Sequence, residues 1–293
     1  MDRDYRALID QRVIALYDDF AHVHLDRRLF LERLGRLVGA TAAAAIMPLL
    51  RANYAAALQV PANDPRPAAA VLEYPGASGA VRGYLARPAG ADKRPAVVVI
   101  HENRGLSPYI QDVVRRLAVA GYVALAPDLL SSVGGTPEDE DEAMARFARL
   151  DRDTAAADAA KAVDYLLGRA DATGKVGAVG FCWGGGGVNL LATVSPRLNA
   201  AVAFYGVAPP LDRVPNIKAA LLLHYAGLDD RVNATRAGYE AALKSAGVSY
   251  TAYVYEGVNH AFHNDTAGPR YNAAAAKLAW RRTLAFFDET LKS

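Results

Sequence analysis

Apolar and polar positions follow two kinds of spacing along the chain, and each predicts a kind of element. Short apolar runs predict strands at 71–74, 81–86, 96–101, 122–126, 176–181, 200–204, 220–225 and 250–255. Apolar residues three and four apart predict helices at 107–120, 137–170, 235–246 and 270–291. After an antiparallel first pair, strands alternate with helices. This alternation predicts an α/β fold with a mainly parallel sheet and helices on both faces.

The first 60 residues have a different pattern and predict a helical extension. Apolar residues at 5–20 recur at spacings of three and four, as on one face of a helix. The apolar stretch at 37–50 is shorter than the ~20 residues that span a bilayer, so no stable membrane span is predicted. A segment at 61–70 that is rich in Pro and Ala is interpreted as a linker to a main domain at 71–293.

Two interpretations of this extension stay open. Arg27 and Arg28, the apolar run that follows and the alanines at 55–57 resemble a twin-arginine export signal. Use of that signal predicts a periplasmic protein. The alternative is a retained extension that packs on the main domain of a cytoplasmic protein.

Charge and cysteine content narrow the function classes. The 33 Lys and Arg residues nearly balance 31 Asp and Glu, and a net charge of +2 argues against a nucleic-acid binder that neutralises phosphates. Cys182 is the single cysteine, which excludes an internal disulfide and a metal site built from several cysteines. These counts describe a near-neutral globular protein with one thiol, which fits an enzyme that acts on small molecules.

The cysteine lies where a nucleophile elbow is expected. The segment 180–185 (GFCWGG) follows a predicted strand and opens a helix, which is the G-x-nucleophile-x-G pattern with Cys182 in the nucleophile position. Such a turn lifts the sulfur above the sheet at a helix N-terminus, where the helix dipole favours a thiolate.

An acid and a base follow in the order that such an elbow requires. Asp229 comes after the strand at 220–225, and His260 comes after the strand at 250–255. Asp229 is preferred to Asp230 because it comes first after the strand, and His260 is preferred to His263 because it directly follows a turn. Since parallel strands hold ligands at their carboxyl ends, we expect the three side chains to meet there.

These motifs together resemble the dienelactone hydrolase family of the α/β-hydrolase superfamily, from about residue 71 to the C-terminus. The resemblance is carried by GFCWGG at 180–185, YEGVNHAF at 255–262, and HENRGL at 101–106 ahead of AGYVALAPD at 120–128. It implies an α/β-hydrolase fold and a thiol that Glu102 helps to deprotonate when substrate binds. The backbone N–H groups of Asn103 and Trp183 are the expected oxyanion hole.

The resemblance has one departure that concerns the substrate. Family members that act on dienelactone hold its carboxylate with arginines, one of them four residues after the histidine, where this chain has Asn264. Arg104 or Arg152 is the candidate replacement. The other candidate substrate-binding residues are Tyr205, Phe262 and His263.

The sequence therefore predicts a cysteine-dependent hydrolase of small-molecule esters or lactones that works through a thioester and requires no metal or organic cofactor. One alternative is a thioesterase or other acyl hydrolase with the same triad. Another is a non-catalytic homologue that binds a small ligand. A redox role is disfavoured because the chain has no second cysteine to resolve a sulfenic acid. The oligomeric state and the physiological substrate stay open.

Overall fold

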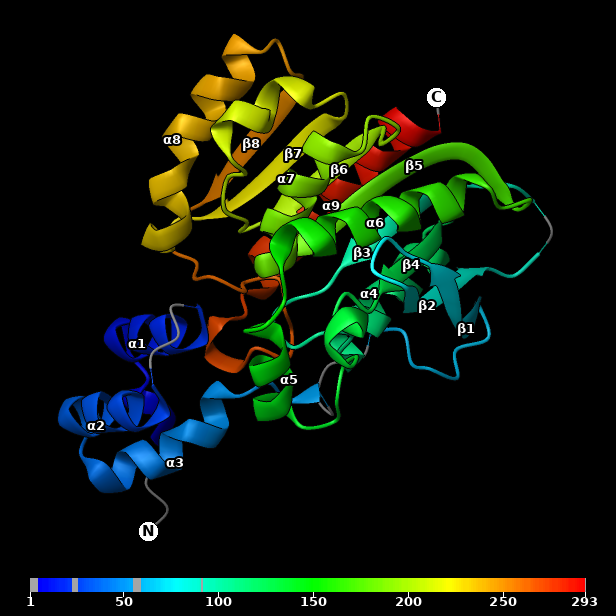
Figure 1. Ribbon diagram of the computed structural model, residues 1–293. Helices are drawn as coiled ribbons and strands as arrows, with labels where there is room; N and C mark the ends of the chain where they lie inside the picture. The colour runs from blue at the N-terminus through cyan, green and yellow to red at the C-terminus, as the bar shows by residue number, and fades with distance from the viewer. Residues whose placement is uncertain (1–4, 23–25, 55–58, 91, 293) are drawn as a thin grey trace.

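The computed structural model describes residues 5–22, 26–54, 59–90 and 92–292 (Figure 1). Its strands are β1 (Pro67–Pro75), β2 (Ala80–Pro88), β3 (Arg94–Ile100), β4 (Val123–Pro127), β5 (Ala172–Phe181), β6 (Ala200–Phe204), β7 (Ala220–Ala226) and β8 (Tyr250–Tyr255). Its helices are α1 (Gln11–His22), α2 (Arg27–Val38), α3 (Ala40–Leu50), α4 (Pro108–Val119), α5 (Glu140–Phe147), α6 (Arg152–Leu167), α7 (Trp183–Val194), α8 (Asp230–Ser245) and α9 (Ala273–Leu291).

The strands form one mixed sheet of eight strands in the order β1-β2-β4-β3-β5-β6-β7-β8. β1 pairs with β2 and β2 with β4 in antiparallel fashion, and the remaining neighbours are parallel. The predicted mainly parallel sheet is therefore confirmed. Its parallel strands all end at one edge, which is where the candidate site residues follow.

Each face of the sheet has its own apolar core. Successive valines of β3 point to opposite faces: Val98 packs in the core under α6, α7 and α8, and Val97 and Val99 pack in the core under α4 and α9. Because both faces of β3 are covered, the strand needs an unbroken apolar run rather than an alternating one. Figure 1 shows helices on both sides of the sheet.

Several element boundaries differ from the prediction. The single helix expected at 137–170 is two helices, α5 and α6, with Asp139 and Asp151 as their N-caps. Each of these aspartates accepts a backbone N–H at the start of its helix, which favours a new helix start at that point. β1 begins at Pro67, inside the segment interpreted as a linker.

The N-terminal helices α1, α2 and α3 form a separate small bundle. Their shared apolar cluster contains Val13, Leu16, Tyr17, Phe30, Leu34, Ala42, Ala43, Ile46 and Leu50. Arg27 and Arg28 open α2, which Asp26 caps, whereas the alanines at 55–57 lie outside the described residues. No single described helix has the length and apolar character of a membrane span, although α2 and α3 together, bent by 116°, meet the length and composition of one.

Candidate active site

Cys182 lies on a strained turn between β5 and α7. Its backbone has a φ of 59° and a ψ of −121°, a conformation that a residue with a side chain rarely adopts. The residue is the N-cap of α7, and its side chain is buried. The expected elbow is therefore present in the backbone, with the sulfur at the positive end of a helix dipole.

The elbow requires glycine at its tight approach to β3. A Cβ on Gly184 would lie 2.3 Å from the carbonyl oxygen of Ile100 and 2.5 Å from that of His101. This approach brings the first turn of α7 close to the loop after β3, which carries Asn103. Trp183 is the first residue of α7, so its N–H has no partner within the helix.

His260 and Asp229 form a buried pair. The Nδ1 atom of His260 donates to the Oδ2 atom of Asp229 over 2.5 Å, and the two side chains are 2% and 1% exposed. Burial lowers the pKa of a histidine, but the carboxylates of Asp18 and Asp229 outweigh it and hold the pKa of His260 well above its ordinary value. The Nε2 atom is buried and has no hydrogen-bond partner among the described residues. Asp229 therefore holds the His260 ring through Nδ1, and Nε2 stays available for another contact.

The thiol contacts a histidine that the sequence interpretation missed. The Nε2 atom of His22, the last residue of α1, lies 3.0 Å from the Sγ atom of Cys182. The Nδ1 atom of His22 lies 2.8 Å from the carbonyl oxygen of Asp18 and must donate to it, since a carbonyl only accepts. The thiol is thus the donor and His22 Nε2 the acceptor. Only the amphipathic pattern of the segment before His22 hinted that it is on a helix.

The electrostatic surroundings keep the two histidines in different protonation states. Burial, reinforced by the positive charges of His260 and Arg231, holds the pKa of His22 well below its ordinary value. The ring centroids of His22 and His260 are 4.5 Å apart. Since two adjacent imidazoles cannot both be charged cheaply, His260 carries the proton and His22 stays neutral.

Glu102 lies in the same cavity but is held by Asn264. The Nδ2 atom of Asn264 donates to Oε2 of Glu102 over 2.7 Å, and its Oδ1 atom accepts from the backbone N–H and the hydroxyl of Thr266. Burial raises the pKa of Glu102. Asn264 therefore orients the glutamate, at the position where the resemblance implies a carboxylate-binding arginine in family members that act on dienelactone.

Two arginines line the cavity at the thiol. Arg104 and Arg270 both reach it, and the Nε atom of Arg270 is buried without a partner among the described residues. Arg104 also pairs with Glu140, at 3.6 Å from Nε to the carboxylate. The sequence interpretation named Arg104 but not Arg270, which lies in a short 3-10 turn at Gly268–Arg270.

The other candidate substrate-binding residues occupy three different places. Tyr205 packs against the His260 ring, with the ring centroids 4.8 Å apart, and its buried hydroxyl has no partner among the described residues. Phe262 is fully buried between aromatic neighbours and does not line the cavity at the thiol. The Nδ1 atom of His263 forms a hydrogen bond of 2.7 Å with the hydroxyl of Tyr109, and the residue lines a different pocket.

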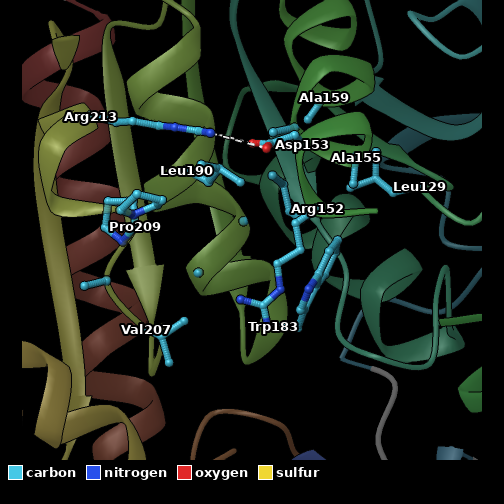
Figure 2. Close-up of a pocket in the computed structure, with 16 residues that line it drawn as sticks. Leu129, Arg152, Asp153, Ala155, Ala159, Trp183, Leu190, Val207, Pro209 and Arg213 are labelled. Carbon is cyan, nitrogen blue, oxygen red and sulfur yellow. Dashed lines mark hydrogen bonds and ion pairs between the residues drawn. The ribbon is translucent and has the colours of Figure 1, made fainter. Parts of the chain in front are cut away.

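Arg152 lies apart from the thiol cavity. It begins α6 and lines a largely apolar pocket of about 190 Å³ behind the elbow, where Figure 2 shows its guanidinium beside Trp183. At the other end of that pocket, Arg213 pairs with Asp153 (Figure 2). The described residues that line the thiol cavity do not include Arg152.

This sheet with a cysteine elbow and a buried His–Asp pair at its carboxyl edge defines an α/β-hydrolase. The sequence model of the dienelactone hydrolase family matches residues 81–291, and a model described as YqhI-like matches residues 1–39. The chain belongs to the dienelactone hydrolase family, and it is a hydrolase of the carboxymethylenebutenolidase and lactonase type.

Individual relatives agree with this assignment. The chain is 33% identical over 237 residues to a protein of Methylorubrum extorquens named "Putative carboxymethylenebutenolidase", which covers 74% of this chain and 80% of that one. It is 33% identical over 225 residues to a "Probable 2-oxo-3-(5-oxofuran-2-ylidene)propanoate lactonase" of Bradyrhizobium, with 69% and 87% covered. A crystal structure from Klebsiella pneumoniae, described as a "Putative Dienelactone Hydrolase", superposes with a TM-score of 0.70 at 29% identity and covers 76% of this chain and 99% of that one.

Proposed function

We propose that this hydrolase cleaves esters and lactones with Cys182 as the nucleophile and His260 and Asp229 as the other members of the triad. The observation that carries the proposal is the position of the thiol on a strained turn at a helix N-terminus, in one cavity with His260. The short bond between His260 and Asp229 supports it further, because it fixes the ring and leaves Nε2 for proton transfer.

In the first half of the reaction, the thiol loses its proton to Glu102 and the sulfur attacks the carbonyl carbon. The carbonyl oxygen becomes an oxyanion, which the backbone N–H groups of Asn103 and Trp183 stabilise. Protonated His260 donates its Nε2 proton to the leaving oxygen as the carbon–oxygen bond breaks. The product of this half is a thioester on Cys182 and a free alcohol.

In the second half, neutral His260 removes a proton from water, and the oxygen of that water attacks the thioester carbon. The sulfur leaves as a thiolate, which takes back the proton that Glu102 holds. Both residues return to their starting states, so the net reaction is ester plus water to acid plus alcohol. The raised pKa of His260 suits it to the role of acid, and the raised pKa of Glu102 suits it to that of a proton acceptor near neutral pH.

The cavity indicates that substrate has to displace His22. Its volume is about 40 Å³, close to that of one water molecule, whereas small-molecule sites enclose several hundred Å³. His22 covers the sulfur directly. Withdrawal of His22 therefore both opens the cavity and frees the thiol proton for Glu102.

The substrate class that fits this site is an ester or lactone with a nearby anionic group. The lactonase and carboxymethylenebutenolidase names of the relatives support a lactone. Arg104 and Arg270 supply two guanidinium groups in the thiol cavity, which suit a carboxylate. Asn264 is committed to Glu102 and is not a candidate for this role.

The experiment is a panel of p-nitrophenyl acetate, unsubstituted lactones and lactones with a carboxylate, run on the wild type and on Cys182→Ala. We expect Cys182→Ala to lose turnover of every substrate that the wild type hydrolyses. Arg12→Ala is the matched control, since Arg12 is exposed on α1 and bonds Asp10. Wild-type rates in a folded Cys182→Ala protein would overturn the proposal.

A further inference from the structure

Three atoms of the kind that ligate transition metals surround the thiol. The Sγ atom of Cys182 and one ring nitrogen each from His22 and His260 all lie within 4.8 Å of one another. His22 comes from the N-terminal helices, whereas the other two residues come from the α/β domain. The triad alone supplies only two such atoms, and the third depends on α1.

Both histidines are held as metal-ligating histidines usually are. The Nδ1 atom of His22 donates to the carbonyl oxygen of Asp18 over 2.8 Å, and that of His260 donates to the carboxylate of Asp229 over 2.5 Å. A partner of this kind on one ring nitrogen fixes the tautomer and directs the other nitrogen to the metal. In both rings Nε2 is the atom that remains.

One of these atoms, Nε2 of His260, is buried. His260 is 3% exposed, and its Nε2 atom has no partner among the described residues. A buried polar atom left in this state costs free energy, on the order of 1–3 kcal/mol. The cavity beside it, about 40 Å³, has room for an ion with one water but not for a substrate.

We propose that Cys182, His22 and His260 bind one Zn²⁺ ion, with a water in the fourth position. One thiolate and two imidazoles are ligands that zinc prefers, and three protein ligands leave a tetrahedral site open. A tetrahedral zinc sets the sulfur and a ligating nitrogen about 3.6 Å apart. The observed 3.0 Å between Cys182 and His22 therefore has to widen by about half an ångström. Binding forms the Zn–S bond and the bond from zinc to Nε2 of His260, and it releases two protons to solvent, one from the thiol and one from that nitrogen.

Two consequences follow for the hydrolase. A zinc ion bound to Sγ blocks the proposed nucleophile, so Zn²⁺ inhibits hydrolysis reversibly. Of the two consequences, only this one rests on the proposed function. The same ion links α1 to the α/β domain through His22, so it holds the N-terminal helices over the site.

The test is a titration of the full chain with Co²⁺, which takes zinc sites and reports a bound thiolate by a near-ultraviolet charge-transfer band. We expect about one ion per chain, visible bands typical of tetrahedral Co²⁺, and loss of all bands when Zn²⁺ is added. Cys182→Ser should remove the charge-transfer band. His22→Ala and His22→Gln should each weaken Co²⁺ binding at least tenfold. Loss of a residue that only orients a metal ligand weakens metal binding 10–100-fold, and His22 is itself a ligand.

Arg12→Ala, on the same helix, is the control and should bind Co²⁺ as the wild type does. Wild-type affinity in both His22 variants overturns the proposal, and so does absence of a thiolate band in the wild type. Inhibition by Zn²⁺ is read separately: EDTA should restore hydrolysis, and the His22 variants should need at least tenfold more Zn²⁺. If Cys182→Ala hydrolyses esters normally, the proposed function fails while the Co²⁺ spectra still decide the metal site.

Discussion

The N-terminal helices and the α/β domain are each held by an apolar core, but they meet through polar contacts. The apolar cluster of α1–α3 includes no described residue of the α/β domain. Between the two regions, Gln11 bonds Asn259, and Arg27 and Arg51 pair with Asp141. Exposed pairs of this kind contribute about 0–1 kcal/mol each.

The hydrogen bonds around the thiol are therefore of two kinds, one within a region and one between the two regions. The bond between His260 and Asp229 lies within the α/β domain and is almost fully buried. The bond from Cys182 to His22 crosses between the regions, so it persists only while α1 stays docked. We expect the first to be essential to hydrolysis and the second to respond to conditions that loosen the N-terminal helices.

The largest expected effect tests the buried pair. Asp229→Asn keeps the size of the side chain but removes the negative charge that orients the His260 ring and stabilises its protonated form. We expect kcat to fall about 10³–10⁴-fold, as it does when the acid of a triad becomes an amide. The measurement is steady-state hydrolysis of p-nitrophenyl acetate. Asp153→Asn is the control, because Asp153 lies in an exposed pair with Arg213 away from the thiol. A loss below tenfold in Asp229→Asn would argue that the buried pair has only a structural role.

The placement of the proposed triad residues at one edge of the sheet was predictable because its signals are local. Cys182 directly follows β5, and Asp229 and His260 lie in the loops after β7 and β8. Parallel strands bring their carboxyl ends to one edge whatever the details of packing. The position of Glu102 was predictable for the same reason, because it lies in the loop after β3. Its hydrogen bond with Asn264 was not, because the two residues are 162 positions apart in the sequence.

The contribution of α1 was not predictable for the opposite reason. His22 and Cys182 are 160 residues apart, and their contact depends on how two separately packed regions dock. The arginines show the same limit. The sequence offers nothing that separates Arg152 from Arg270 as a substrate-binding residue. In the folded protein, Arg270 lines the thiol cavity and Arg152 lines another pocket. The break between α5 and α6, in contrast, was readable from Asp139 and Asp151 as caps.

A smaller effect concerns stability against acid. Burial holds the pKa of His263 well below its ordinary 6.5, so the unfolded chain binds a proton that the folded chain rejects. The free energy of unfolding therefore decreases as the pH falls below about 6.5. One such histidine lowers it by about 1.4 kcal/mol at pH 5.5. His263→Gln should remove this part of the loss. The measurement is urea unfolding of both proteins at pH 7.5 and 5.5.

His22→Gln gives the matched comparison from the other region. Burial also lowers the pKa of His22, but α1 should detach before the α/β domain unfolds. We therefore expect His22→Gln to leave the pH dependence of the main unfolding transition unchanged. Equal flattening in both variants would mean that the two regions unfold as one unit.

The smallest expected effect tests the docking itself. Asp141→Asn removes the carboxylate that accepts from Arg27 of α2 at 3.0 Å and from Arg51, the residue after α3, at 3.1 Å. These pairs are exposed, so we expect docking to weaken by about 0.5–1 kcal/mol. Opening should then increase about two- to fivefold, and alkylation of the buried Cys182 thiol by iodoacetamide should accelerate by the same factor.

Salt separates this effect from a general loosening. Raising the ionic strength screens exposed pairs, so the wild type should approach the alkylation rate of Asp141→Asn, which should itself change little. Asp92→Asn is the control, because Asp92 pairs with Arg94 within the α/β domain at 3.0 Å. If Asp92→Asn accelerates alkylation as much as Asp141→Asn, the thiol is exposed by motion of the α/β domain. If neither variant does, the other polar contacts between the regions, such as that of Gln11 with Asn259, hold His22 in place without help from the ion pairs.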